Sequence, residues 1–458
     1  MLYFFNFGIE QKPIVMKKLL MSLMLAGVLL TGCDSGKKEV NISSETYHAT
    51  MQQLTDVIVH DIFSPPVASR IYAYPSIAGY EILALNNPEV KSMAGQLSDL
   101  DNIPQPSGEV SYELAALEAF IKVGTALIFS EEKMDEYKNN LYTELREGVN
   151  RSYFDNSVAY GDRVAEHILA WADKDNYKQT RTFPKFTLTE DPTRWKPTPP
   201  AYMEAIEPHW NQIRTFVIDS AQQFAPIRPT EYDMKDKSSL FYQEVMEVYE
   251  VGKNLDEEQK EIASFWECNP YVMNVTGHVM YASKKITPGG HWIGIVKIAC
   301  QQEKTDINKT AEAYALTSIA LADAFISCWD EKYRSNLIRP ETLINEFIDE
   351  EWLPLLQTPP FPEYTSGHSV ISSAAAIALT SIFGEDFAFE DDTEVKYGLG
   401  VRSFRSFIHA SEEAAVSRLY GGIHYRPAID NGVTQGRALG SYLVNKLEIR
   451  NQTLSKND

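Results

Sequence analysis

Three short stretches in the second half of the sequence bring cations, histidines and small residues together in a pattern that suits chemistry on an oxyanion. They are KYRSNLIRP at 332–340, TSGHSVISS at 365–373 and SRLYGGIHYRPAID at 417–430. The candidate site residues in them are Lys332, Arg339, Ser366, Gly367, His368, Arg418 and His424. Cationic side chains, a hydroxyl and a backbone amide can together hold a tetrahedral or trigonal bipyramidal oxyanion, and the histidines can act on it.

The stretch around His368 begins a predicted helix that covers 366–383. Thr365 or Ser366 can cap its start. The free N–H groups at a helix start and the positive end of the helix dipole attract oxyanions, and Gly367 has no side chain to keep an anion away. His368 is then placed to give or take a proton. The alternative interpretation is an ordinary capped helix with a histidine on its surface.

A second predicted helix, upstream, carries the lysine. Apolar residues recur at helical spacing from Ala315 to Trp329, and Lys332 continues this stripe three residues later. A lysine in that position can serve a site inside the protein. Alternatively, it lies over the edge of the core, where the last turn of a helix also favours a cation. Arg339, just before Pro340, could equally be an arginine on a surface loop.

The third stretch contains the end of a short predicted helix. Ser411 and the two glutamates after it mark the start, and Gly421 with Gly422 marks the end, so Arg418 falls in the last turn. His424 follows just past the glycine turn. Taken singly, these features are a cation at a helix end and a loop histidine. Taken together, the three stretches favour one anion site.

The order and spacing of these residues resemble the superfamily that unites vanadium-dependent haloperoxidases with type 2 phosphatidic acid phosphatases. Six residues separate Lys332 from Arg339, and five separate Arg418 from His424. Within that superfamily the chain looks most like the bacterial haloperoxidases, particularly the iodide-oxidising ones. The supporting stretches are FWECNPYV at 265–272, GGHW at 289–292, CWDEKYRSNLIRPET at 328–342 and FPEYTSGHS at 361–369.

Two positions depart from the pattern of that superfamily. Thr365 stands where the family usually has proline. The acid that usually comes four residues after the second histidine is displaced, because position 428 is alanine. The nearest carboxylate is Asp430, which is therefore the candidate acid that orients His424.

The resemblance implies a vanadate cofactor and an all-α, helical-bundle fold. His424 would bind vanadium, and the vanadate oxygens would be held by Lys332, Arg339, Ser366, the Gly367 N–H and Arg418. Vanadium(V) would act as a Lewis acid on hydrogen peroxide, while Lys332 draws charge from one peroxide oxygen. A halide, with iodide favoured, would then attack and be released as hypohalous acid. His368 would handle the protons. The candidate wall of the halide pocket consists of Trp329, Phe361 and Tyr271, although core packing explains each aromatic taken singly.

Two other functions remain open from the residues alone. In an acid phosphatase, His424 would attack the phosphorus of a phosphomonoester, His368 would protonate the leaving alkoxide and the cations would stabilise the pentavalent state. Vanadate mimics that state, so the same inventory serves both enzymes. A non-catalytic oxyanion-binding lipoprotein is the third option, but pure capture does not need two histidines.

The rest of the chain predicts an all-α protein. The segments with helical spacing are 112–129, 133–149, 160–173, 238–251, 256–267, 311–330 and 366–383. The proline-rich stretch EDPTRWKPTPPAY at 190–202 cannot continue a helix. We therefore predict an N-terminal helical region at 45–234 and a C-terminal catalytic region at 235–450. A single merged bundle fits the pattern nearly as well.

Residues 1–32 have the features of a signal peptide. Lys17 and Lys18 precede an apolar run at 19–30, which is too short to span a membrane, and LTGC ends at Cys33 in the manner of a bacterial lipobox. We expect lipidation of Cys33, a tether at 33–44 and a periplasmic or outer-surface place in the bacterial cell envelope, with the lipid as the only membrane contact. Translation could instead start at Met16. The alternative interpretation of the apolar run is a buried leucine-rich helix.

Composition narrows the class of partner. The chain has 458 residues, 44% of them apolar, which predicts a globular protein with a large core. Its formal net charge of −21 argues against nucleic acid as a binding partner. Cys268, Cys300 and Cys328 are too few and too widely spaced for a CxxC-type metal knuckle and are expected to be buried free thiols. The expected partners are hydrogen peroxide with a halide, or a phosphomonoester; the sequence indicates no oligomeric state.

Overall fold

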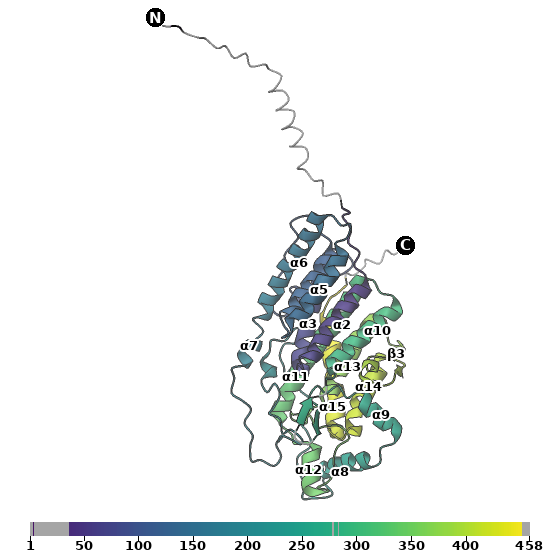
Figure 1. The fold of residues 1–458 in the computed structure, drawn as a ribbon. Coiled ribbons are helices and arrows are strands. Elements are labelled where there is room, and N and C mark those ends of the chain that lie inside the picture. Colours follow the sequence, from purple (N-terminus) through teal and green to yellow (C-terminus); the bar gives the residue numbers. More distant parts are fainter. Residues whose placement is uncertain (1–2, 4–35, 277–278, 283, 451–458) are drawn as a thin grey trace, which may run out of the picture.

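The computed structural model describes residues 3, 36–276, 279–282 and 284–450, and its regular structure is almost all helical, which confirms the all-α prediction (Figure 1). The signal peptide and Cys33 lie outside the described residues. The longer helices are α2 (Ser44–His60), α3 (Pro65–Leu85), α4 (Tyr112–Thr125), α5 (Glu131–Leu145), α6 (Arg151–Ala172), α8 (Leu240–Lys253), α9 (Glu257–Phe265), α10 (Pro288–Glu303), α11 (Ile307–Ser335), α12 (Pro340–Phe347), α13 (Gly367–Phe383), α14 (Phe407–Tyr420) and α15 (Arg426–Lys446). The shorter elements are α7 (Tyr177–Thr180), η1 (Trp210–Gln212), η2 (Val395–Tyr397) and two antiparallel strand pairs, β1 (Met273–Thr276) with β2 (Val279–Ala282) and β3 (Phe389–Asp391) with β4 (Arg402–Phe404).

The N-terminal helices and the helices that carry the candidate site gather in different parts of the molecule. In Figure 1 the purple and blue helices α2, α3, α5 and α6 gather at one end, and the green to yellow helices α12 to α15 lie toward the other. The long helix α11 joins the two groups, because it packs against α3 and against α13. Helix α13 in turn packs against α14 and α15. The elements that carry the candidate site therefore belong to one connected bundle.

Helix α11 is a core helix. Every residue from Thr310 to Lys332 is buried. In the part of the chain that the structure describes, it is the one helix with the length and hydropathy of a membrane span, and its apolar window is wholly buried within the protein. Lys332 is fully buried as well, so the alternative of a lysine over the edge of the core is excluded.

The predicted helices all occur, with shifts of a few residues at their ends for most of them. Helix α6 starts earlier than predicted because the side chain of Asn150 caps it by accepting a hydrogen bond from the Tyr153 N–H. Helix α14 also starts earlier, at Phe407, because Ser406 is its cap. The predicted start at Ser411 is therefore wrong, and its hydroxyl donates to a carbonyl within the same helix.

The predicted boundary between two helical regions lies in an irregular segment. Between Thr180 and Leu240 the only helical element is η1, and the proline-rich stretch runs past the end of α11, where the Trp195 N–H donates to the Asn336 carbonyl at 3.0 Å. One hydrophobic core cluster includes residues from Val40 to Ile449, and a second includes residues from Met234 to Ile429. The division into two helical regions and the single merged bundle both stay predictions.

Glycines let α15 lie directly against α13. Gly432, Gly436 and Gly440 recur every four residues, so they share one face of α15. A Cβ atom at Gly436 would lie 2.1 Å from the carbonyl oxygen of Val370, and one at Gly440 would lie 3.0 Å from that of Ala374. This close approach fixes the helix whose first turn carries His368.

Gly436→Ala is expected to lower the free energy of unfolding by roughly 1–3 kcal/mol, because the added methyl group must push the two helices apart. Thermal or urea unfolding of the variant measures this loss. Gly400→Ala is the matched control, since a Cβ atom there meets nothing within 4 Å. Equal stability of the two variants would contradict the close packing of α15 on α13.

Candidate active site

Several segments that are distant in the sequence meet at one small cavity of about 40 Å³. Its polar lining includes Gly367 and His368 at the start of α13, Arg418 in the last turn of α14, and His424 after the glycine turn. Sites for drug-sized ligands measure about 300–1,000 Å³. A cavity of this size suits a single small ion.

Arg339 fixes the protonation of His424. Its Nη1 lies 3.2 Å from Nε2 of His424 and donates to the Ile423 carbonyl at 2.8 Å. A guanidinium nitrogen can only donate, so Nε2 of His424 accepts and Nδ1 carries the ring proton. Burial, followed by the charge of Arg339, lowers the pKa of His424 well below its usual range. The ring is therefore neutral, with Nε2 deprotonated, which is the form that binds a metal or attacks phosphorus.

Glu363 holds the other side of His424. Its Oε1 accepts from Nδ1 of His424 at 2.7 Å and from the Tyr425 N–H at 3.0 Å. Asp430, the predicted orienting acid, is instead exposed on α15, where the charge of Arg426 acts on it. Glu363 thus takes the role predicted for Asp430, and that prediction is corrected.

The sequence contained a signal for Glu363 that the spacing argument passed over. The superfamily pattern places the orienting acid after His424, which is why Asp430 was predicted. Glu363 lies instead in the stretch FPEYTSGHS, five residues before His368. An acid so near the cap of α13, in a stretch already marked as part of the site, was a candidate by position.

The buried polar atoms at the cavity that have no hydrogen-bond partner in the described part of the protein include Nη2 of Arg339 and Nε2 of His368. Such atoms are rare in folded proteins. Gly367 leaves this place free of a side chain, since an ideal Cβ atom there would already touch the ring of Trp329 at 3.7 Å. A guanidinium donor, an imidazole nitrogen and a bare helix start are what an oxyanion requires, so these residues fit vanadate.

His368 is neutral in this arrangement. Burial is the main cause that lowers its pKa well below the usual range, and the charge of Arg418 acts in the same direction. The ring also hydrogen bonds to the backbone of Trp266. With its Nε2 free and lining the cavity, His368 can take up a proton from a bound group.

Lys332 is fully engaged with the backbone. Its Nζ donates to the carbonyls of Pro362 at 3.1 Å, Glu363 at 3.0 Å and Thr365 at 2.5 Å. These three bonds use all three donors of an ammonium group. Burial lowers the pKa of Lys332 to about 8. The lysine thus holds the loop that leads into α13, and it must exchange one of these bonds before it can donate to an anion.

Ser366 and Arg418 occupy the helix ends where the sequence placed them. The Oγ of Ser366 accepts from the Ser369 N–H at 3.3 Å and so caps α13, while its O–H can still donate to an anion. Arg418 is buried, with its Nε donating to the Ser417 hydroxyl at 2.9 Å and its Nη2 to the Trp266 carbonyl at 2.8 Å. The predicted cap and the predicted last-turn arginine are both confirmed.

Two of the three predicted halide-pocket aromatics line the cavity. Trp329 and Phe361 do so, with ring centres 5.0 Å apart. Tyr271 does not line it, and its hydroxyl instead hydrogen bonds to Ser64 near the charge of Glu207. The apolar wall of the cavity therefore includes Trp329 from α11 and Phe361 from the loop before α13, but not Tyr271.

Sulfate binding to the cavity is expected to tighten as the pH falls from 8 to 6. His368 and His424 are neutral because burial lowers their pKa values, and burial places the pKa of Lys332 and of Glu363 at about 8. A bound anion raises the pKa of each group, so binding takes up protons and strengthens at lower pH, by at most about tenfold per pH unit for each proton.

Isothermal titration calorimetry with sulfate, whose charge stays constant over this range, measures the effect. Arg418→Ala is the control that assigns the heat to the cavity. Equal or weaker binding at pH 6 would contradict the proton uptake.

Comparisons with known proteins agree with this geometry. The family described as VCPO second helical-bundle domain matches residues 312–452, which hold all seven anion-site residues. The crystal structure of a bacterial vanadium-dependent iodoperoxidase is 55% identical, covers 91% of this chain and 99% of its own, and superposes with a TM-score of 0.86. No curated protein sequence matches the chain at a significant level.

A more distant likeness concerns the fold alone. The holo and apo forms of a bacterial vanadium-dependent chloroperoxidase are each 16% identical to this chain. They cover 84% of it and 93% and 94% of their own chains, with TM-scores of 0.63 and 0.62. The helical architecture thus persists where most of the sequence has changed.

Proposed function

Because the chain belongs to the family of bacterial vanadium-dependent haloperoxidases, we propose that it binds vanadate in the cavity and uses hydrogen peroxide to oxidise a halide to hypohalous acid. Iodide is the proposed halide, since the relative that is 55% identical over nearly the whole chain is an iodoperoxidase. The observation that carries the proposal is the pair of unpartnered buried atoms, Arg339 Nη2 and His368 Nε2, beside the deprotonated Nε2 of His424.

Different residues around the cavity would bind different atoms of the cofactor. Nε2 of His424 would bind vanadium, and the oxygens would accept from Arg339, Arg418, the Ser366 hydroxyl and the Gly367 N–H. Bound vanadate supplies a Lewis acid that activates peroxide toward attack by the halide. Glu363 keeps the proton on Nδ1 of His424, so that Nε2 remains the ligating nitrogen.

His368 is the proposed proton carrier. The overall reaction is H₂O₂ + X⁻ + H⁺ → HOX + H₂O, so protons must leave the peroxide and return to the products. The free Nε2 of His368 is neutral and lines the cavity, which lets it accept a proton and give it back. Lys332 adds positive charge beside the cavity and holds the loop backbone that positions Ser366.

A phosphatase remains the second candidate, and the neutral His424 favours it specifically. Its deprotonated Nε2 is the nucleophile that a phosphohistidine mechanism needs, and His368 could protonate the leaving alkoxide. The sequence identity to the bacterial iodoperoxidase favours the peroxidase instead, because this identity extends well beyond the anion site.

The deciding experiment measures both reactions on the same preparation. Vanadate-loaded protein should oxidise iodide with hydrogen peroxide, and bromide less readily because bromide is harder to oxidise. Phosphate should compete with vanadate, and vanadate-free protein should hydrolyse a phosphomonoester slowly at most. Fast phosphatase turnover that vanadate blocks, without halide oxidation at any vanadate level, would overturn the peroxidase in favour of the phosphatase.

We also propose that the protein is lipid-anchored at Cys33 in the bacterial cell envelope. The charged start, the short apolar run and the LTGC sequence support this, and these residues lie outside the described part of the chain. Cys33→Ser should shift the protein from the membrane fraction to the soluble fraction. Cys300→Ser, at a buried free thiol, is the control, and membrane retention of Cys33→Ser would refute the anchor.

A further inference from the structure

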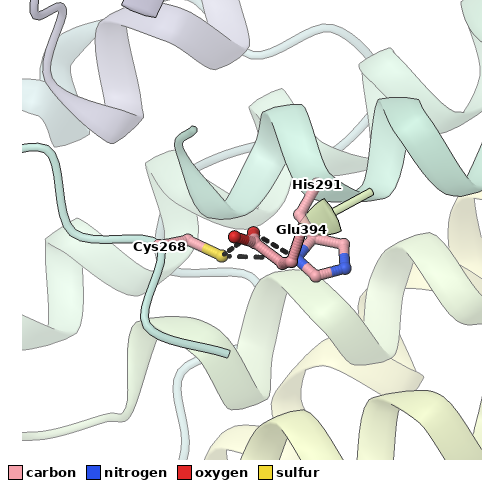
Figure 2. Close-up of side chains that lie close together, drawn as sticks. All are labelled: Cys268, His291 and Glu394. Atoms are coloured by element: carbon pink, nitrogen blue, oxygen red, sulfur yellow. Dashed lines mark hydrogen bonds and ion pairs between the residues drawn. The ribbon is translucent and has the colours of Figure 1, made fainter. Parts of the chain in front are cut away.

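A second cluster of chemically active side chains lies beside the anion cavity, which one of its members, Cys268, also lines. It joins Cys268, which follows α9, His291 in the first turn of α10, and Glu394, which precedes η2 (Figure 2). All three are buried. Figure 2 shows the sulfur, one ring nitrogen and the carboxylate turned toward one another. Cys268 Sγ lies 3.4 Å from His291 Nδ1 and 3.7 Å from Glu394 Oε1, and the nitrogen and oxygen are 3.2 Å apart.

These three distances match one face of a zinc tetrahedron. Zinc binds thiolate sulfur at about 2.3 Å, imidazole nitrogen at about 2.0–2.1 Å and carboxylate oxygen at about 2.0–2.2 Å. With tetrahedral angles, such bonds put the ligand atoms roughly 3.3–3.6 Å apart. An ion can therefore sit above the triangle with adjustments of a few tenths of an ångström.

The ring of His291 is held in the orientation that a metal ligand needs. Its other nitrogen, Nε2, pairs with Asp391 at 2.8 Å, and Asp391 in turn accepts from the N–H of Thr393 at 3.0 Å and from its hydroxyl at 2.6 Å. A carboxylate behind the ring is the common support of a ligating histidine, because it keeps the proton away from the nitrogen that faces the metal.

The charges of the cluster also call for a cation. Two buried carboxylates, Asp391 and Glu394, share one imidazole, and within the described residues neither forms an ion pair with lysine or arginine. The imidazole of His291 can offset only one of these two buried negative charges, and a buried charge that is not offset is costly. A divalent ion bound to the thiolate and to Glu394 would offset it.

We propose that Cys268, His291 and Glu394 bind one Zn²⁺ ion, with Asp391 orienting His291 and a water molecule as the fourth ligand. The ion ties together three chain segments behind the anion cavity. The indole of Trp266 stacks on His291 with ring centres 4.5 Å apart, and its carbonyl accepts from Arg418. The zinc site thereby supports the backbone that holds an anion-site residue, and it does not depend on which reaction that site performs.

The test measures metal in the full chain without vanadate. Protein purified without a metal-affinity step and dialysed against buffer should hold about one zinc per chain by mass spectrometry of the metal. Cys268→Ser and His291→Ala should hold less than a tenth of that. Asp391→Asn should weaken zinc binding by about 10–100-fold. Cys300→Ser and His424→Ala are the controls, and both should keep the zinc.

A second measurement covers variants that fold poorly. Chelator-treated wild-type protein should regain thermal stability when zinc alone is added, and Glu394→Gln should not. Cobalt in place of zinc should give a thiolate charge-transfer absorption that Cys268→Ser lacks. Wild-type protein that takes up no zinc, or zinc retained in full by Cys268→Ser and His291→Ala, would overturn the site and leave a hydrogen-bonded His291 between two carboxylates.

Discussion

His424→Ala is expected to abolish tight vanadate binding and, with it, peroxide-dependent iodide oxidation. The variant loses the one deprotonated ring nitrogen that can bind vanadium, and it leaves the Oε1 of Glu363 and the Nη1 of Arg339 each short of a partner. Loss of a residue that merely orients a ligand weakens metal binding by about 10–100-fold. Loss of the ligand itself should exceed that range.

Equilibrium dialysis with vanadate, followed by measurement of vanadium per chain, gives the affinity directly. His48→Ala is a matched control, because His48 is also buried but bonds to Tyr314 and does not line the cavity. Tight vanadate binding by His424→Ala would show that vanadium is bound elsewhere.

His368→Ala is expected to keep most of the vanadate affinity while losing roughly 10²–10⁴-fold in turnover at saturating vanadate, the usual contribution of a general acid or base. The physical reason is that Nε2 of His368 has no hydrogen-bond partner and its ring bonds only to the backbone of Trp266, so the bonds that Arg339 and Glu363 make to His424 stay intact. Iodide oxidation over a range of vanadate concentrations separates affinity from turnover.

The pH profile adds an independent check on this role. If His368 carries the proton, the variant should lose a titration that wild-type turnover shows, since its pKa rises once an anion is bound. Equal loss of vanadate in His368→Ala and His424→Ala would undo the division between proton carrier and metal ligand.

The sequence by itself was enough to find most of the anion site, because that site is built from helix ends. Several site residues lie at fixed positions relative to a helix boundary, namely the cap Ser366, the first helical residue Gly367 and the last-turn Arg418. Helix boundaries can be recognised in a sequence from capping residues and glycines. The same local rules predicted the helices and hence the all-α fold. They failed at the start of α14, where Ser406 caps the helix and the predicted Ser411 lies inside it.

Contacts between distant segments were decided by the tertiary structure alone. Glu363 and Asp430 are both acids near a histidine in the sequence, but only the folded chain brings Glu363 to Nδ1 of His424. The sequence marked Lys332 as a cation for the site, whereas its surroundings direct all three donors to backbone carbonyls. Cys268 and Glu394 are separated by more than a hundred residues, and no local pattern relates them. Local signals thus determined which groups are present, and packing of the helices decided which of them meet, because hydrogen bonds and metal coordination act over only a few ångströms.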